Sequence, residues 1–325
     1  MAAPREERLS GLDCVNAVTT LLQRVRNAHP TKGAFQAAEV QYWWNTPHPT
    51  DTLGQLFWFD DLGRPEAAVV ATEFGEGVTL VYDKTTVLIV TMPDASDDWV
   101  RHVIGRGLDH LAEVGIDAID LEIDRADDVS RSFLFDRGFT VKGDAVVQCW
   151  LDADSDARPP ISPLPDGYPL AARQDLMDRP HHMTAPHRPG FEGRLNQLSL
   201  YRSDLDLVIL DRDDNPAAYA LFWNDPVTST GLVEPVRTFD EHRGRGLSRH
   251  LLTTGINLLA DAGARRISIC YEPDNEISGH LYRSIGFVPH CRTDLLTGTT
   301  RPPTESRGPF PRGSVISRDL SARND

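Results

Sequence analysis

The chain has 325 residues, a net charge of −15, 40% hydrophobic residues and 25% charged residues. This length is enough for two domains of ordinary size, each with its own core. The acidic balance argues against nucleic acid as a partner, because neutralising phosphates requires a basic surface. The sequence has no apolar run as long as a membrane span, no apolar secretion segment in its first residues and no C-x-x-C pair. We therefore expect a protein of the reduced cytoplasm with no membrane partner and no metal site.

The first part of the chain alternates between helical and extended patterns. Apolar residues at helical spacing predict a helix over residues 11–27, and a short second helix is expected over 37–44. Runs of β-branched and aromatic residues predict the strands that follow. The remaining elements expected in this part are strands over 55–60, 66–73, 78–81 and 85–91, a helix over 98–114, a strand over 118–122, a helix over 127–136 and a strand over 145–151.

The second part begins after a stretch with the composition of a linker. Residues 152–166 are rich in Asp, Pro and Ser. A hairpin is expected from 207–210 and 217–223, which flank the turn 213–216. The later elements expected here are an extended run over 231–239, a helix over 251–259, a buried strand over 267–271, and a helix opened by Asn275. The residues from 297 onward are rich in Thr, Pro, Arg, Gly and Ser, which predicts a tail with little fixed structure.

The two parts repeat each other at an offset of 148 residues. Each part has a glycine between a predicted helix and an apolar strand, and a Gly-Phe pair further on. Agreement at several separated landmarks without a gap indicates two copies of one α/β domain in tandem. The matched pairs are Gly115 with Gly263, Gly138 with Gly286, Ile119 with Ile267, Leu121 with Ile269, and Asp127 with Asn275.

A basic, glycine-containing turn lies between the extended run and the helix of the second copy. Its sequence is Arg243-Gly244-Arg245-Gly246-Leu247-Ser248. Glycines let backbone N–H groups approach a phosphate closely, and a helix N-terminus adds partial positive charge. Neither G-x-x-x-x-G-K-[ST] nor G-x-G-x-x-G is present. The turn therefore predicts an anion site of another type.

The order strand, R-G-x-G-x-[G/A/S], helix resembles the pyrophosphate signature of the GNAT acetyltransferase superfamily, with Ser248 at a position where the family usually has Gly or Ala. Leu281 to Phe287 is similar to the family's L-Y-x-x-x-G-F ending, and the resemblance covers roughly 167–295. It implies two tandem GNAT-like domains of the α/β (α+β) class, each with a mixed, mostly antiparallel sheet flanked by helices. The division expected is a degenerate domain over 1–151, a linker over 152–166, an active domain over 167–296 and a flexible tail over 297–325.

The first copy lacks the cofactor-binding and catalytic residues that the resemblance implies for the second copy. At the offset of 148, the basic turn falls on Ala95 to Val100, where Asp97 and Asp98 would repel a pyrophosphate. Tyr282 falls on Leu134 and Glu234 falls on Thr86. The glycines and strand residues remain. This pattern predicts a first copy retained for its shape, and a single cofactor site in the second copy.

The resemblance also implies a cofactor and roles for individual residues. Acetyl-CoA would donate an acetyl group to a primary amine, which attacks the thioester directly. The backbone around Val236 and Thr238 would pair with the pantetheine amides, and Asn275 would contact the pantetheine arm. The N–H groups of the turn would hold the pyrophosphate; they belong to Arg243, Gly244, Arg245, Gly246, Leu247 and Ser248.

Two side chains are candidates for proton transfer. Tyr282 matches the family tyrosine placed near the cofactor sulfur, where a phenol could protonate the departing thiolate. The alternative is a helix tyrosine packed in the core. Glu234 lies on the strand that leads to the turn and is the candidate base, directly or through a water, because an apolar strand raises a carboxyl pKa. The alternative is an edge glutamate facing water or a salt bridge.

These residues favour an acetyltransferase acting on a small-molecule amine. The alternatives are a non-catalytic acyl-CoA-binding or regulatory protein, a structural protein in which both copies have decayed, and an enzyme that acetylates a protein amine. His181, His182 and His187 have the composition of metal ligands, but are expected in a loop near the acceptor rather than on a metal. The identity of the acceptor stays open, and so does the choice between monomer and homodimer.

Overall fold

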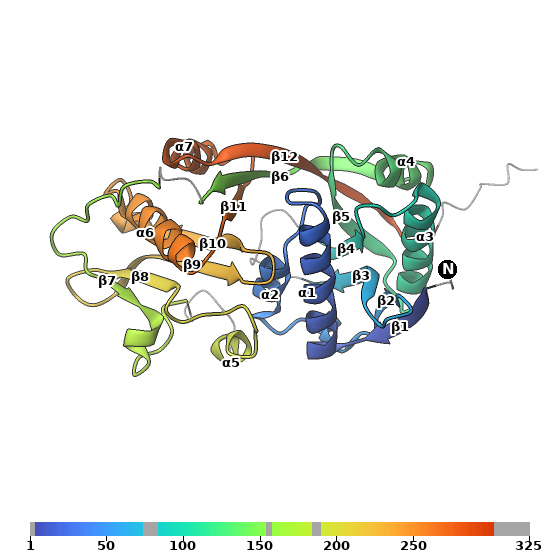
Figure 1. Ribbon diagram of the computed structural model, residues 1–325, viewed down its shortest axis with the longest axis horizontal. Helices are drawn as coiled ribbons and strands as arrows, with labels where there is room; N and C mark the ends of the chain where they lie inside the picture. The colour runs from blue at the N-terminus through green and yellow to red at the C-terminus, as the bar shows by residue number, and fades with distance from the viewer. Residues whose placement is uncertain (1–3, 74–83, 154–157, 184–189, 302–325) are drawn as a thin grey trace, which may run out of the picture.

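Twelve strands of both halves form one sheet in the computed structural model, which describes residues 4–73, 84–153, 158–183 and 190–301 (Figure 1). The strand order is β1-β2-β3-β4-β5-β12-β6-β11-β10-β9-β8-β7. Neighbouring strands run antiparallel except in the pairs β4–β5 and β10–β11, which are parallel. The expected class, a mixed and mostly antiparallel sheet flanked by helices, is confirmed.

The elements of the first half follow the predicted order. The strand at the N-terminus and the 3-10 turn were not expected from the sequence. The predicted strand over 78–81 lies outside the described residues. The bounds are β1 (Arg5–Leu9), α1 (Gly11–Ala28), α2 (Ala37–Trp44), η1 (Pro49–Thr52), β2 (Gln55–Phe59), β3 (Pro65–Thr72), β4 (Thr85–Thr91), α3 (Asp97–Glu113), β5 (Ala118–Asp124), α4 (Asp128–Asp136) and β6 (Thr140–Asp152).

The second half repeats this order from β8 onward. Its bounds are β7 (Leu170–Ala172), η2 (Arg173–Leu176), α5 (Phe191–Leu195), β8 (Asp206–Leu210), β9 (Pro216–Asp225), β10 (Thr230–Thr238), η3 (Asp240–His242), α6 (Leu247–Asp261), β11 (Arg266–Tyr271), α7 (Glu276–Ile285) and β12 (Val288–Thr299). The start of β5 and β11, of α4 and α7, and of β6 and β12 are each 148 residues apart. Residues 297–299, expected at the start of the tail, belong to β12, because they pair with β5.

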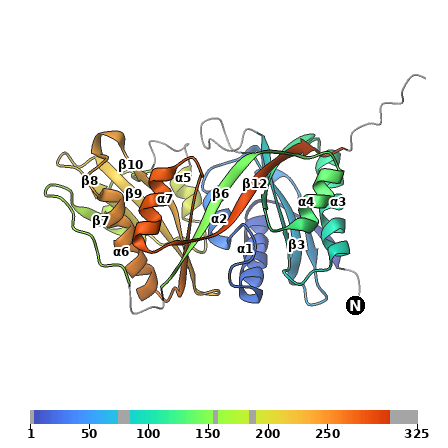
Figure 2. The same ribbon diagram turned by 90° about the horizontal axis from the view of Figure 1, so that it is seen from above.

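The last strand of each half lies within the other half's part of the sheet. β6 pairs with β11 of the second half, with Ile267 opposite Leu151, while β12 pairs with β5 of the first half, with Leu296 opposite Leu121. β6 and β12 also pair with each other, and Figure 2 shows them crossing side by side between the halves. The two copies therefore exchange their final strands, so neither half completes its sheet alone.

Three apolar cores hold the sheet. One lies beneath α3 and α4 of the first half and includes Leu296 of β12; a second lies beneath α6 and α7 and includes Val147 of β6. The third core joins the halves, because Leu21 of α1 and Trp223 of β9 belong to the same buried cluster. Figure 1 shows α1 and α2 at the centre of the molecule, between the two ends of the sheet. The expected pair of separate cores is thus supplemented by a shared one.

The expected linker over 152–166 begins one residue too early, because Asp152 belongs to β6 and pairs with Arg266 of β11. Residues 158–166 have no regular secondary structure but are fixed to α6. The Ser162 N–H donates to Thr253 Oγ1 at 3.1 Å, and the Asn257 amide donates to the Pro159 carbonyl at 3.1 Å. His250 also contacts the Ser162 carbonyl. These bonds hold residues 158–166 along the outer side of the helix that follows the basic turn.

Candidate active site

The basic turn of residues 243–248 leads from β10 into α6. Gly244 has φ +74° and Gly246, the residue before the helix, has φ +79°. Both angles lie in the left-handed region, which glycine enters without the steric cost that a Cβ imposes. A Cβ built on either glycine would meet no atom within 4 Å, so their backbone angles, not a lack of space, require glycine. The turn therefore faces an open region.

The amide groups of this turn are available to a ligand. In the described part of the chain, no protein acceptor takes the N–H groups of Gly244 to Ser248. Gly244, Arg245 and Gly246 are exposed. Consecutive free N–H groups at a helix N-terminus are an arrangement that binds phosphate groups. The geometry is thus compatible with the predicted pyrophosphate site, which stays a prediction.

Side chains around the turn fix its ends. Thr238 Oγ1 lies 2.6 Å from Ser248 Oγ, which ties the last residue of β10 to the first turn of α6. Arg243 forms an exposed ion pair with Asp240 at 2.8 Å. The Arg245 guanidinium lies 5.8 Å from the centre of the Tyr168 ring. Both arginines of the turn are therefore exposed, and their side chains lie on its outer side.

The corresponding turn of the first half carries negative charge. Ser96 caps α3 by accepting the Trp99 N–H at 3.3 Å. Asp97 and Asp98 occupy the first turn of that helix and are exposed, with only loose contacts to Arg101 at 3.8 and 3.4 Å. One N–H of the helix N-terminus is thus capped, and two carboxylates that disfavour an anion lie beside it. That this half binds no acetyl-CoA stays a prediction.

The strand that leads to the basic turn diverges from its parallel neighbour. β10 pairs with β11 only from Thr230 to Leu232, whereas it pairs with β9 as far as Thr238. Val236 and Thr238 therefore lie where this edge of β10 has no strand partner among the described residues. An extended ligand can add to such an edge through main-chain hydrogen bonds. This agrees with the expected role of Val236 and Thr238 toward the pantetheine amides, although nothing tests that role here.

Glu234 lies at the point of divergence, in the irregular stretch between Val233 and Val236 of the ladder. Trp223 donates its indole N–H to the Glu234 carbonyl oxygen at 2.8 Å. Oε2 of Glu234 is buried and has no hydrogen-bond partner among the described residues. Burial, and next the negative charge of Glu122, raise the pKa of Glu234 from 4.5 to about 8. A buried carboxyl group with an unsatisfied oxygen beside an open strand edge is suited to accept a proton.

The strand register changes which residue of the first half corresponds to Glu234. Ile119 and Ile267 are equivalent, and they pair with Thr85 and Gly231 respectively. Counting from these partners, Glu234 corresponds to Leu88 rather than to Thr86. The difference arises because β10 is shifted by two residues relative to β4. In either register the first half has no carboxylate at this position.

Two carboxyl groups of the first half interact with Glu234, and neither could be recognised from the sequence. Glu39 is in the first turn of α2, and its Oε2 accepts the Gln36 N–H at 3.2 Å. Burial, followed by the charges of Glu234 and Glu122, raises the pKa of Glu39. Glu122, on β5, accepts the Thr293 hydroxyl at 2.7 Å. The base candidate of the second half is therefore surrounded by acidic groups from the first half.

Tyr282 lies on α7 and is only 7% exposed. Its ring packs edge-on against Tyr271 and Phe287, with ring centres 6.1 and 6.2 Å away. Burial is the main cause that raises the pKa of its phenol, and the nearby charge of Glu234 contributes. The structure thus brings Tyr282 near Glu234 and keeps the phenol protonated. Its aromatic contacts also fit a packing residue, so its role as an acid stays a prediction.

Asn275 has a structural task that the sequence did not reveal. Its side-chain oxygen accepts the Ser278 N–H at 3.2 Å and caps α7. Asp127 caps α4 in the same way through Ser130 at 3.0 Å. Asn275 is exposed, so its amide NH₂ is the group that would meet a cofactor. The predicted contact with pantetheine is compatible with this geometry and is not tested by it.

The expected acceptor-side histidines form a buried cluster with Asp206. His181 Nδ1 accepts the Met183 N–H at 3.1 Å, which places the proton on Nε2, 2.8 Å from Asp206 Oδ2. His182 Nε2 lies 3.0 Å from Asp206 Oδ1, and the Tyr201 hydroxyl donates to the same carboxylate at 2.9 Å. Burial raises the pKa of Asp206, but the hydrogen bonds and charges of His181 and His182 outweigh it and lower the pKa to about 2. The three residues lie close enough to bind a metal, but the proton on His181 Nε2 is directed at Asp206 in a hydrogen bond, where a metal would need a free lone pair. His187 lies outside the described residues.

Comparison with known proteins supports the resemblance seen in the sequence. Residues 170–287 match the model of the "Acetyltransferase (GNAT) family", which confirms the resemblance for this region. A mycothiol acetyltransferase from Tsukamurella paurometabola is 38% identical over 68 residues, which is 21% of this chain and 23% of that protein. The chain thus spans less than a quarter of that curated relative.

Two solved structures share the fold along almost the whole chain. A tandem GNAT protein from the clavulanic acid biosynthesis pathway has a TM-score of 0.64 and 15% identity, and the match covers 92% of this chain and 99% of that chain. A GCN5-related N-acetyltransferase from Sphaerobacter thermophilus has a TM-score of 0.57 and 16% identity, with 92% and 96% covered. The tandem arrangement is therefore shared by known proteins. Among the described residues, no helix combines the length and apolar character needed to cross a membrane.

Proposed function

We propose that this protein transfers an acetyl group from acetyl-CoA to a primary amine of a small molecule, and that the reaction takes place in the second half. The observation that carries the proposal is the open, basic turn of residues 243–248 beside the divergence of β10 and β11. Free N–H groups, two left-handed glycines and an unpaired strand edge occur together there. The family match over 170–287 supports acyl transfer as the class of reaction.

The pyrophosphate of acetyl-CoA would bind the N–H groups of residues 244–248, with the side chains of Arg243 and Arg245 neutralising charge. The Arg243 N–H, which was also expected to bind it, already donates to the Asp240 carbonyl at 3.3 Å. Its pantetheine arm would extend along β10 past Thr238 and Val236, and pass the amide of Asn275. This path ends at the divergence of the strands, where Glu234 lies. The thioester would thus be placed between the base candidate and Tyr282.

The reaction needs three proton transfers. Glu234 takes a proton from the ammonium group of the acceptor, directly or through a water, and the free amine attacks the thioester carbonyl. The C–N bond forms, the C–S bond breaks, and the Tyr282 phenol gives its proton to the departing thiolate. The nitrogen then loses its remaining extra proton to the Tyr282 phenolate, which restores the acid. The raised pKa of Glu234 suits a base, and the raised pKa of Tyr282 keeps the phenol protonated until charge develops on sulfur.

The same geometry disfavours two alternatives, a non-catalytic acyl-CoA-binding protein and an enzyme that acetylates a protein amine. A non-catalytic acyl-CoA-binding protein has no need for a buried carboxyl with an unsatisfied oxygen at the end of the cofactor path. Acetylation of a protein amine is disfavoured because Glu234 is enclosed by α2 and β5 of the first half rather than facing an open surface. The curated relative's name, a mycothiol acetyltransferase, also points to a small-molecule acceptor.

The test is a thiol-release assay with acetyl-CoA and a panel of amines, with product identified by mass spectrometry. We expect one or more amines to be acetylated at nitrogen, and the Gly246→Glu variant to be inactive. Release of coenzyme A that no amine accelerates would contradict the proposal.

A further inference from the structure

The strand divergence of the second half has a counterpart in the first half, and that counterpart contains a cavity. β4 and β5 pair only from Thr85 to Val87, and then separate as β10 and β11 do. A cavity of about 470 Å³ lies in the opening. This volume is within the range of small-molecule sites. Its walls are the end of β4, the turn before α3, the end of β5 and the start of α4.

The cavity thus occupies the place that acetyl-CoA would take in the second half. The elements that correspond to its walls are those that carry Val236 to Ser248 and Asn275. Asp127, which lines the cavity, is the equivalent of Asn275 in the repeat. The first half has therefore kept the cleft and changed its lining.

The lining is acidic at one side and apolar at the other. Five carboxylates line the cavity against one cation, Lys32, whose ammonium donates to the Pro93 carbonyl at 3.0 Å. The apolar wall includes Leu22, Val25 and Phe35. The carboxylates are those of Asp97, Glu122, Asp124, Asp127 and Asp128. A polyanion such as coenzyme A is repelled by this lining, whereas an organic cation with an apolar body is attracted.

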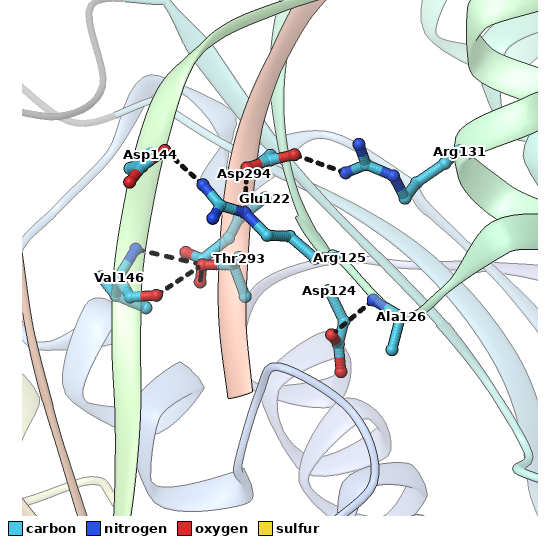
Figure 3. A network of polar contacts seen from close by, with 9 residues as sticks. All are labelled: Glu122, Asp124, Arg125, Ala126, Arg131, Asp144, Val146, Thr293 and Asp294. Atoms are coloured by element: carbon cyan, nitrogen blue, oxygen red, sulfur yellow. Dashed lines mark hydrogen bonds and ion pairs between the residues drawn. The ribbon is translucent and has the colours of Figure 1, made fainter. Parts of the chain in front are cut away.

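Two arginines near the cavity, Arg125 and Arg131, form ion pairs with carboxylates that do not line it. Arg125 bonds Asp294 at 2.6 Å and also contacts Asp144, and Arg131 bonds Asp294 at 2.6 Å. Figure 3 shows Arg125 and Arg131 converging on Asp294, while Asp124 points away from Arg125 and accepts the Ala126 N–H. These guanidinium groups therefore do not neutralise the cavity's carboxylates.

One buried carboxyl group is common to the cavity and to the surroundings of the proposed base. Glu122 is 95% buried and lines the cavity, and its charge is one cause of the raised pKa of Glu234. Glu234 itself is not part of the cavity lining. A cation in the cavity would thus interact with a carboxyl group that also acts on the candidate base.

We infer that the cleft of the first half binds the acceptor, and that the acceptor is a small organic polycation: one cationic group lies among Asp124, Asp127 and Asp128, and the apolar body lies against Leu22, Val25 and Phe35. This inference rests on the proposed function in taking the bound cation to be the acceptor. It assigns the degenerate copy the task of selecting substrate. The discrimination expected is against monoamines, which lack the second charge.

The test uses isothermal calorimetry on the full chain with spermidine, cadaverine and the monoamine pentylamine. The variant Asp127→Asn/Asp128→Asn removes two charges and keeps the cap of α4, because Asn275 caps α7 in the same way. The matched control is Asp213→Asn/Asp214→Asn, an equal change of charge in the exposed turn between β8 and β9. We expect spermidine or cadaverine to bind more tightly than pentylamine. We expect the first variant alone to weaken binding, by roughly three- to tenfold.

Kinetics separates this inference from the proposed function. With the better polyamine as acceptor, the Asp127→Asn/Asp128→Asn variant should raise KM for the amine and leave both kcat and acetyl-CoA affinity unchanged. Equal weakening by the control, or polyamine binding no tighter than that of pentylamine, would overturn the inference while acetyl-CoA binding still stood. Polyamine binding that is sensitive to Asp127 and Asp128 in a protein unable to bind acetyl-CoA would instead overturn the proposed function, and with it the assignment of the cation as acceptor.

Discussion

Glu234 combines burial, an oxygen without a partner among the described residues and the nearby charge of Glu122 from another part of the chain. Each of these features disfavours the charged form, so the pKa of the carboxyl group is raised far above that of an exposed glutamate. Burial is the larger cause, and the charge of Glu122 adds to it. Because Glu122 belongs to the first half, the pKa of the candidate base depends on both halves.

We predict that Glu234→Gln removes an ionisation near pH 8 from the rate profile. In the wild type, kcat/KM should rise with pH through about 8, because only the ionised carboxyl accepts a proton. The variant should lose roughly 10²–10⁴-fold in turnover and lack that rise. An unchanged profile in the variant, measured with the same amine, would assign the ionisation to another group.

The same shift predicts a stability effect. The folded-state pKa of about 8 lies above the ordinary value of 4.5, so the native protein keeps a proton that the unfolded chain releases. The free energy of unfolding contributed by Glu234 is therefore present below pH 4.5 and is lost as pH rises through about 8. Urea unfolding should show the wild type losing stability relative to Glu234→Gln across this interval. A constant difference between the two proteins would show that the pKa is not raised.

Tyr282→Phe should lower kcat more than it weakens acetyl-CoA binding. The hydroxyl is needed only as charge develops on sulfur, and a general acid typically contributes ~10²–10⁴-fold. The ring contacts with Tyr271 and Phe287 remain in the variant, so the fold should be preserved. Steady-state kinetics and cofactor calorimetry distinguish the cases: near-full turnover would place the acid elsewhere, and lost cofactor affinity would make Tyr282 a packing residue.

At the scale of elements, the two halves differ at the turn between a strand and a helix. Both halves have a strand, a turn and a helix at equivalent places, and the first N–H groups of both helices have no acceptor within the helix. In the first half Ser96 accepts one of these N–H groups and two aspartates add negative charge, whereas in the second half Gly246 leaves the turn open. We therefore expect the cofactor to bind the second half and not the first.

Gly246→Glu should abolish acetyl-CoA binding without unfolding the protein. The new carboxylate would lie among the amide groups of the turn, where it takes the place of the pyrophosphate and repels it. Gly63→Glu is the matched control, because Gly63 also has a left-handed φ, of +72°, and open space around its Cβ, but lies in the turn between β2 and β3. An acetyl-CoA affinity retained in Gly246→Glu, or lost equally in the control, would show that the turn is not the site.

At the scale of the whole molecule, the exchange of β6 and β12 makes the halves depend on each other. Leu296 of β12 is fully buried in the core of the first half, together with residues of α3 and β5. β6 fills the corresponding place beside β11. The cleft of the first half and the turn of the second are therefore held in one rigid sheet.

Leu296→Ala should destabilise the first half although the residue belongs to the second copy. The loss of a fully buried leucine side chain typically costs ~2–5 kcal/mol. Hydrogen exchange should increase in β5 and α3 as well as in β12. The partly exposed Leu258→Ala on α6 serves as the control. Faster exchange confined to the second half would contradict the strand exchange.

The sequence predicted the repeated elements, but it did not predict the exchange; its prediction of the cofactor path stays a prediction. Helix caps and glycines mark the ends of α4, α7, β5 and β11 at a constant offset, and local chemistry fixes those features. The partner of β6 is a different matter: β5 and β11 are similar strands, and an antiparallel β6 fits beside either of them. The choice depends on the whole sheet. Glu39 and Glu122 could not be found for the same reason, because they come near Glu234 only when α2 packs on β10 and both halves share one sheet.

The number of acetyl-CoA molecules bound per chain tests the central claim most directly. Calorimetric titration of the wild-type protein should give one site, because the open turn of residues 243–248 binds the pyrophosphate and the capped, acidic turn at Ser96 to Asp98 does not. Two sites of equal affinity, or none, would contradict this account.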